Sequence, residues 1–197
     1  MTPGTTDDQD RADMIRLSAG HDAALNDLMD RYGQKLFHYL VRALQSEDDA
    51  ADLAQETFCR IYQSRAKYDP KQKFSAWLYA IATNLVKDRY RYRTRHPQVS
   101  LDAENAETET SLQERLPDHH SSPSETLVSV ERADTVRRAV AALPEELRLP
   151  LILAEYEAQS HAEIGQVLGC TAKAVETRIY RARLQLRQTL APLMQNA

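Results

Sequence analysis

Glycine and cysteine are scarce in this 197-residue sequence, which contains 5 Gly and 2 Cys. Few glycines disfavour turn-rich all-β folds and the glycine-rich loops that bind phosphates. Cys59 and Cys170 lie far apart and form no CxxC motif, so neither a disulfide framework nor a zinc site is expected. No apolar run approaches the ~20 residues of a membrane span, and the acidic N-terminus does not resemble a signal peptide. We therefore expect a cytoplasmic protein without membrane insertion.

Catalytic motifs are missing as well. The sequence has no GxSxG, no HExxH and no glycine-rich phosphate loop. His119 and His120 follow Asp118, but they lie in a stretch without the helical periodicity that would place further metal ligands beside them. We predict that the protein is not an enzyme, with no catalytic residues, no metal and no cofactor.

The charge is distributed unevenly along a chain of ordinary globular composition, with 42% hydrophobic residues and a net charge of −4. Residues 60–95 carry a net charge of +8 and residues 161–197 a net charge of +3, whereas residues 1–59 and 96–135 carry −7 each. Two separate basic blocks in an acidic protein indicate contact with a polyanion at two places.

Apolar residues recur at three- and four-residue spacings along most of the chain, which predicts an all-α fold. Residues 1–95 are expected to form a bundle of three long helices preceded by a shorter one. Residues 96–123 lose this pattern, contain three prolines and have an acidic excess, which predicts a flexible linker. Residues 124–197 return to helical spacing. The prediction is two small helical domains joined by a flexible acidic linker.

Several residues predict where helices begin or bend. Ser46 and Thr171 are expected to cap the helices that follow them, and Ser160 with Glu163 has the spacing of a capping box. Pro150 falls inside a predicted helix, where its missing N–H predicts a kink.

The C-terminal domain contains the pattern of a helix-turn-helix. A short helix and a longer one are expected to pack together through apolar residues, with Gly169 in the turn between them. An α-helix fits the major groove of B-DNA, where Glu176 and Thr177 suit base edges and Arg178 suits phosphates. The alternative is a helical hairpin with a solvated basic face. The candidate DNA-binding residues are Thr171, Lys173, Glu176, Thr177, Arg178, Tyr180, Arg181 and Arg183.

Two further patterns lie in the N-terminal domain. Arginines alternate with tyrosines near residue 90; arginines bind phosphates, and tyrosine rings stack on unpaired bases at ~1–3 kcal/mol per base. Earlier in the chain, Asp52 and Glu56 share a helix face, which favours docking of a partner protein. Solvated charged faces are the alternative in both cases. The candidate docking residues are Asp48, Asp49, Asp52, Gln55 and Glu56.

These three patterns, in this order, resemble a bacterial sigma factor of the extracytoplasmic-function (ECF) group. The resemblance is carried by DLAQETFCRIY (52–62), FSAWLYAIATNLVKDRYRYRTR (74–95) and the segment from LPEELRLP to RARLQLR (143–187). It implies a protein that binds core RNA polymerase and directs initiation at promoters with −35 and −10 elements.

The resemblance also assigns roles. The acidic helix is expected to dock on the clamp helices of the polymerase β′ subunit, with the β subunit as a further contact, and the helix-turn-helix is expected to read the −35 element. The acidic linker is expected to pass through the polymerase, and an anti-sigma factor is an expected partner. The expected −10 residues are Lys67, Lys71, Lys73, Asn84, Lys87, Arg89, Tyr90, Arg91, Tyr92, Arg93 and Arg95.

One departure from the family pattern limits what the resemblance implies about the −35 element. Glu176 stands where the family often has a basic or polar residue, so the −35 sequence preference is not inherited. Two alternatives remain open: a free-standing helix-turn-helix regulator, and a polymerase-binding decoy that does not melt promoters.

Overall fold

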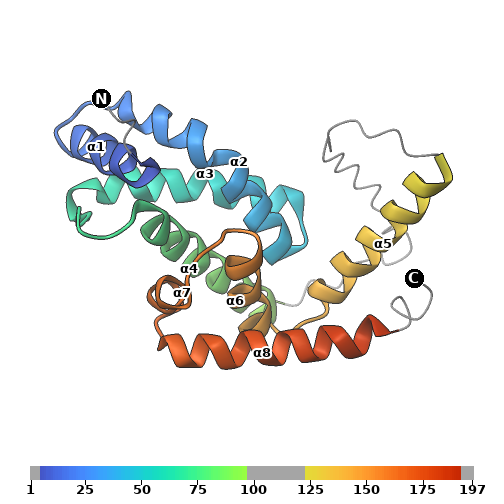
Figure 1. The fold of residues 1–197 in the computed structure, drawn as a ribbon. Coiled ribbons are helices and arrows are strands. Elements are labelled where there is room, and N and C mark those ends of the chain that lie inside the picture. The colour runs from blue at the N-terminus through green and yellow to red at the C-terminus, as the bar shows by residue number, and fades with distance from the viewer. Residues whose placement is uncertain (1–4, 97–122, 192–197) are drawn as a thin grey trace.

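The computed structural model describes residues 5–96 and 123–191, and of residues 123–131 only the backbone (Figure 1). Residues 97–122, which make up all but the two ends of the predicted linker and include His119 and His120, lie outside the described residues. All regular elements within the described ranges are helical, as the sequence predicted. The first five are α1 (Thr6–Ser18), α2 (Ala24–Leu44), α3 (Glu47–Ser64), η1 (Arg65–Lys67) and α4 (Phe74–Arg95). The remaining four are α5 (Pro123–Ala141), α6 (Glu145–Glu155), α7 (His161–Leu168) and α8 (Ala172–Thr189).

The predicted helix caps are confirmed. The Ser46 hydroxyl accepts a hydrogen bond from the backbone N–H of Asp49 at 3.3 Å, and Thr171 caps α8 in the same way. Ser160 and Glu163 form the complete capping box at the start of α7. These bonds satisfy N–H groups that have no partner within a helix. Pro150 is buried inside α6, and the helix continues past it to Glu155.

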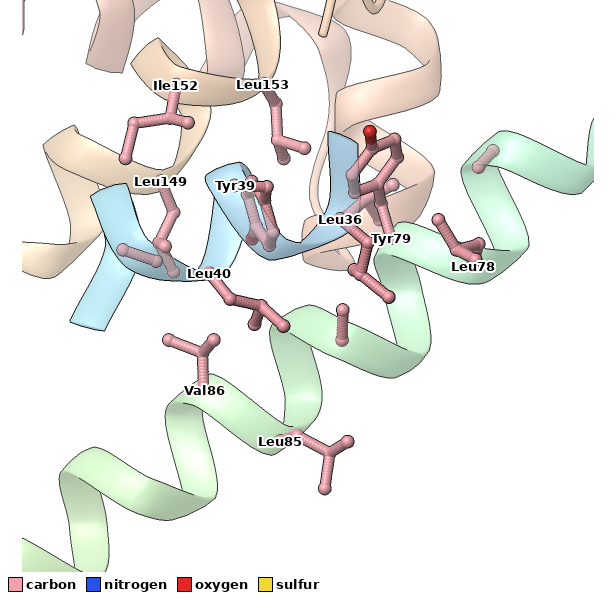
Figure 2. Packing of buried hydrophobic residues seen from close by; sticks show 14 of the residues in the cluster. Leu36, Tyr39, Leu40, Leu78, Tyr79, Leu85, Val86, Leu149, Ile152 and Leu153 are labelled. Atoms are coloured by element: carbon pink, nitrogen blue, oxygen red, sulfur yellow. The ribbon is translucent and has the colours of Figure 1, made fainter. Parts of the chain in front are cut away.

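Residues 5–96 form an N-terminal lobe and residues 123–191 a C-terminal lobe, and one hydrophobic core extends through both. α2, α4 and α6 meet at its centre (Figure 2). Leu149 and Ile152 of α6 are fully or almost fully buried, together with Tyr39 and Leu40 of α2 and Val86 of α4. Burying one large apolar side chain is worth about 1.5–3 kcal/mol. Packing between the lobes therefore contributes to the stability of this arrangement.

Candidate polymerase and nucleic-acid interfaces

The candidate docking residues of α3 divide into an exposed group and one enclosed member. Asp48, Asp52 and Gln55 are exposed, and Glu56 pairs with Arg60 at 2.7 Å along the same helix. An exposed pair of this kind contributes little to stability, which leaves this face available to a partner. Asp49 differs, because its side chain is only 14% exposed and faces α4.

Asp49 joins the predicted docking surface to the predicted −10 surface. One of its carboxylate oxygens accepts a hydrogen bond from Arg89, and the other accepts one from Arg93. Both arginines belong to the basic end of α4. Their positive charges are partly neutralised within the protein, which lowers the electrostatic attraction that they offer to a phosphate backbone.

The two tyrosines proposed for base stacking lie in different surroundings. Tyr90 is half-buried, its hydroxyl donates to the backbone carbonyl of Ala43, and Arg148 of α6 donates to the same hydroxyl. The Arg148 guanidinium also lies 5.4 Å from the centroid of the Tyr90 ring, and burial raises the pKa of the Tyr90 hydroxyl. Tyr92 is 59% exposed. In this arrangement Tyr92 offers a ring to solvent, whereas Tyr90 connects the two lobes.

The remaining −10 candidates lie on α4 and in the segment that precedes it. Lys73 bridges three elements: it lies 2.9 Å from Glu163 of α7 and 3.4 Å from Asp7 of α1. The hydrogen bond to Glu163, with its charge, raises the pKa of Lys73. Lys87 is half-buried. The exposed members of the set are Lys67, Lys71, Lys73, Asn84, Arg91, Tyr92, Arg93 and Arg95.

The helix-turn-helix has the predicted inner face. Ile164, Val167, Val175, Ile179 and Ala182 are buried, so α7 packs against the inner face of α8. The turn depends on Gly165, which the sequence analysis did not single out. A Cβ atom at this position would lie 2.7 Å from the backbone carbonyl oxygen of Cys170, closer than real Cβ contacts allow. Gly169 ends α7 with a φ of 68°, which glycine adopts without strain.

Most of the −35 candidates lie on the outer face of α8. Tyr180 is 67% exposed, and Lys173 pairs with Glu176 at 2.9 Å. Two arginines of this set have partners within the protein and are less available to phosphates. Arg178 is half-buried beside the Cys170 sulfur at 3.6 Å, and Arg183 pairs with Glu155 at 2.5 Å. The remaining exposed candidates are Thr171, Thr177 and Arg181.

Two polar contacts between the lobes were not anticipated from the sequence. Arg148 is 6% exposed and donates to the backbone carbonyl of Ala141 at 2.6 Å as well as to Tyr90. Tyr79 of α4 donates to a carboxylate oxygen of Glu157, which follows α6. Burial raises the pKa of the Glu157 carboxyl, and the bond from Tyr79 opposes that rise. A charged residue within the apolar run LRLPLIL was the only signal for Arg148.

The helices that the structure describes include none with the length and apolar character needed to cross a membrane. Two helical lobes, with a helix-turn-helix in the second and exposed basic residues on α4 and α8, define a helical DNA-binding protein.

Comparison with known proteins identifies the family. The sigma-70 region 2 family model matches residues 28–96, and the sigma-70 region 4 model matches residues 133–186. The chain is 35% identical to the ECF RNA polymerase sigma factor SigW of Bacillus subtilis, over 90% of this chain and 95% of SigW. It is 32% identical to the RNA polymerase sigma-H factor of Pseudomonas aeruginosa, over 98% and 99%.

A solved structure agrees with these relatives. CnrH in complex with the cytosolic domain of CnrY shares 26% identity and a TM-score of 0.67, over 93% of this chain and 98% of CnrH. The chain therefore belongs to the ECF group of RNA polymerase sigma factors. Its function is that of a sigma factor, which directs RNA polymerase to promoters.

Proposed function

We propose that this sigma factor docks on the β′ clamp helices of core RNA polymerase through Asp48, Asp52, Gln55 and Glu56, with the β subunit as a further contact. The observation that carries this proposal is the exposure of Asp48, Asp52 and Gln55 along one face of α3, with Glu56 paired to Arg60 of the same helix, while Asp49 is held by Arg89 and Arg93. The protein has no catalytic activity of its own, because the polymerase supplies the chemistry.

Promoter recognition is divided between the lobes. The basic end of α4 and the α3–α4 loop, residues 65–73, contact the melted −10 element, and the outer face of α8 reads the −35 element. An exposed ring such as that of Tyr92 suits stacking on an unpaired base. Exposed Lys173, Thr177 and Arg181 suit the major groove and its phosphates.

The lobes separate when both elements are read. Elements centred about 25 base pairs apart are separated by about 85 Å of B-DNA, at 3.4 Å per base pair. A compact chain of this length has a radius of gyration of only about 16 Å. The packed arrangement, in which α6 and α7 contact α2 and α4, is therefore the form of the free protein.

Run-off transcription tests the docking assignment. Core RNA polymerase without sigma is combined with genomic fragments of the source bacterium and with the wild-type chain or the Asp52→Lys, Glu56→Lys variant. We expect discrete transcripts only with the wild type. Asp30→Lys, which reverses an exposed charge on α2, is the control and should behave as wild type.

The rival functions predict different results. Polymerase binding without new transcripts would identify a decoy, and tight specific duplex binding without polymerase would identify a free-standing regulator. Unchanged co-elution of the Asp52→Lys, Glu56→Lys variant with polymerase would show that docking uses another surface.

An anti-sigma factor is the proposed regulatory partner, since CnrH binds CnrY. A groove between α2 and α5 is lined by Val41, Val136 and Tyr156 and flanked by Arg132 and Arg137. This combination fits an acidic amphipathic segment. The Arg132→Glu, Arg137→Glu variant should raise transcription from target promoters in cells and leave run-off transcription with purified components unchanged. Equal promoter activity of variant and wild type in cells would assign the partner to another surface.

A further inference from the structure

α1 contacts the α3–α4 loop although it precedes the matched sigma-70 region 2, which begins at residue 28. The two elements lie side by side at one end of the N-terminal lobe (Figure 1). The Arg11 Nε donates to the carbonyl of Pro70 at 2.9 Å, and the Ser18 hydroxyl donates to the carbonyl of Arg65 at 2.9 Å. α1 is thereby hydrogen-bonded to the first residue of the loop, Arg65, and to Pro70 further along it.

α1 is itself fixed firmly to the lobe. Met14 and Leu17 are fully buried, and Arg31 of α2 bridges the carboxylates of Asp10 and Asp13. The Tyr32 hydroxyl also donates to Asp10. Buried charges paired in this way are costly to separate, so α1 forms a rigid support.

The bonds from Arg11 and Ser18 are directed at the backbone of the loop. Both are exposed contacts and add little to the core of the lobe. Bonds within the loop, such as that from the Lys71 N–H to Asp69 at 2.9 Å, shape its tip but do not attach it to α1. The bonds from Arg11 and Ser18 restrict the path of the loop relative to α4. The start of α4 is itself fixed, because its first residue, Phe74, packs on Tyr32 of α2.

We infer that α1 holds the α3–α4 loop in the conformation that receives unpaired −10 bases, with Arg11 and Ser18 as positioning residues. This inference rests on the proposed contact of the loop with the −10 element. A loop that is ordered before binding does not lose conformational entropy when the DNA arrives, and its affinity is correspondingly higher.

The experiment measures binding of a fluorescent single-stranded DNA to holoenzyme assembled from the full chain and core polymerase. The DNA carries the non-template −10 sequence of a promoter mapped by run-off transcription. The Arg11→Ala, Ser18→Ala variant should bind about tenfold more weakly, the equivalent of two net hydrogen bonds. Affinity for polymerase and for a −35 duplex should not change, whereas a general loss of folding would reduce both.

Two controls separate positioning from other effects. Arg16→Ala removes a second arginine of α1 that pairs with Asp13 and Asp27, away from the loop, and should bind as wild type. Arg11→Gln keeps an N–H donor and loses the charge, so it should retain most of the affinity. The single variant Arg11→Ala is the reference for this control. If Arg11→Gln binds as weakly as Arg11→Ala, the arginine acts through its charge and the inference is wrong.

A Lys67→Ala, Lys71→Ala variant tests the underlying function independently. If this variant loses affinity while Arg11→Ala, Ser18→Ala binds as wild type, the loop contacts DNA but α1 does not position it. If the lysine variant also binds as wild type, the assignment of the loop to the −10 element fails, and the inference fails with it.

Discussion

The Tyr79 hydroxyl donates a hydrogen bond to the Glu157 carboxylate across the boundary between the two lobes. The two residues are 78 positions apart in sequence. The proposed function requires the lobes to separate when a promoter is read. This bond therefore stabilises the packed form over the separated form.

Lobe separation should depend on pH through Glu157. Burial raises the pKa of this carboxyl in the packed form, and exposure on separation returns the pKa to its ordinary value. The packed form therefore binds the proton more strongly, and packing is favoured as the pH falls through the raised pKa toward the ordinary value. The radius of gyration from small-angle scattering should be larger at about pH 8 than at about pH 5. Glu157→Gln, which keeps an acceptor for Tyr79, should remove this difference; a variant with the wild-type pH response would refute the role of Glu157.

Arg148→Met should weaken the packing of the lobes. The substitution fills similar space but leaves the Tyr90 hydroxyl without its donor and the Ala141 carbonyl without the 2.6 Å bond. Loss of buried polar partners costs about 1–3 kcal/mol. Urea denaturation measures this loss. Combination with Tyr90→Phe should give less than the sum of the two single effects, and strictly additive effects would mean that the pair is not coupled.

Asp49→Asn should release two arginines of α4 for DNA. Without the carboxylate charge, Arg89 and Arg93 attract phosphates more strongly, so single-stranded DNA should bind more tightly. The salt dependence of binding should also become steeper, by about 0.7 in log–log slope for each additional phosphate contact. Asp52→Asn on the exposed face is the control. Equal slopes for wild type and Asp49→Asn would show that the two arginines do not contact DNA.

Gly165→Ala should destabilise the helix-turn-helix. The added Cβ would lie 2.7 Å from the Cys170 carbonyl oxygen, so the turn between α7 and α8 must shift, at about 1–3 kcal/mol. The melting temperature and the affinity for a −35 duplex should both fall. Gly33→Ala is the matched control, since its Cβ meets no atom within 4 Å and lies inside α2. That variant should be more stable by about 1 kcal/mol, and equal stability of the two variants would contradict the close contact at Gly165.

Much of the fold could be predicted from the sequence because helices are specified by neighbouring residues. The periodic apolar residues, the cap at Ser46 and the capping box of Ser160 and Glu163 act over three or four positions, and the structure confirms them. The inner face of the helix-turn-helix followed from the same periodicity, since Val175 and Ile179 are buried. The order of the patterns indicated the sigma family, which the relatives confirm.

Only the tertiary structure decided which of the candidate residues face solvent. Asp49 and Tyr90 carry the same local signals as their neighbours, yet Asp49 is enclosed by Arg89 and Arg93, and Tyr90 by Arg148. These partners lie 40 or more positions away, and helical spacing contains no information about contacts over such distances. The core shared by the two lobes has the same origin, because a helix's periodicity defines its apolar face but not the helix that covers it.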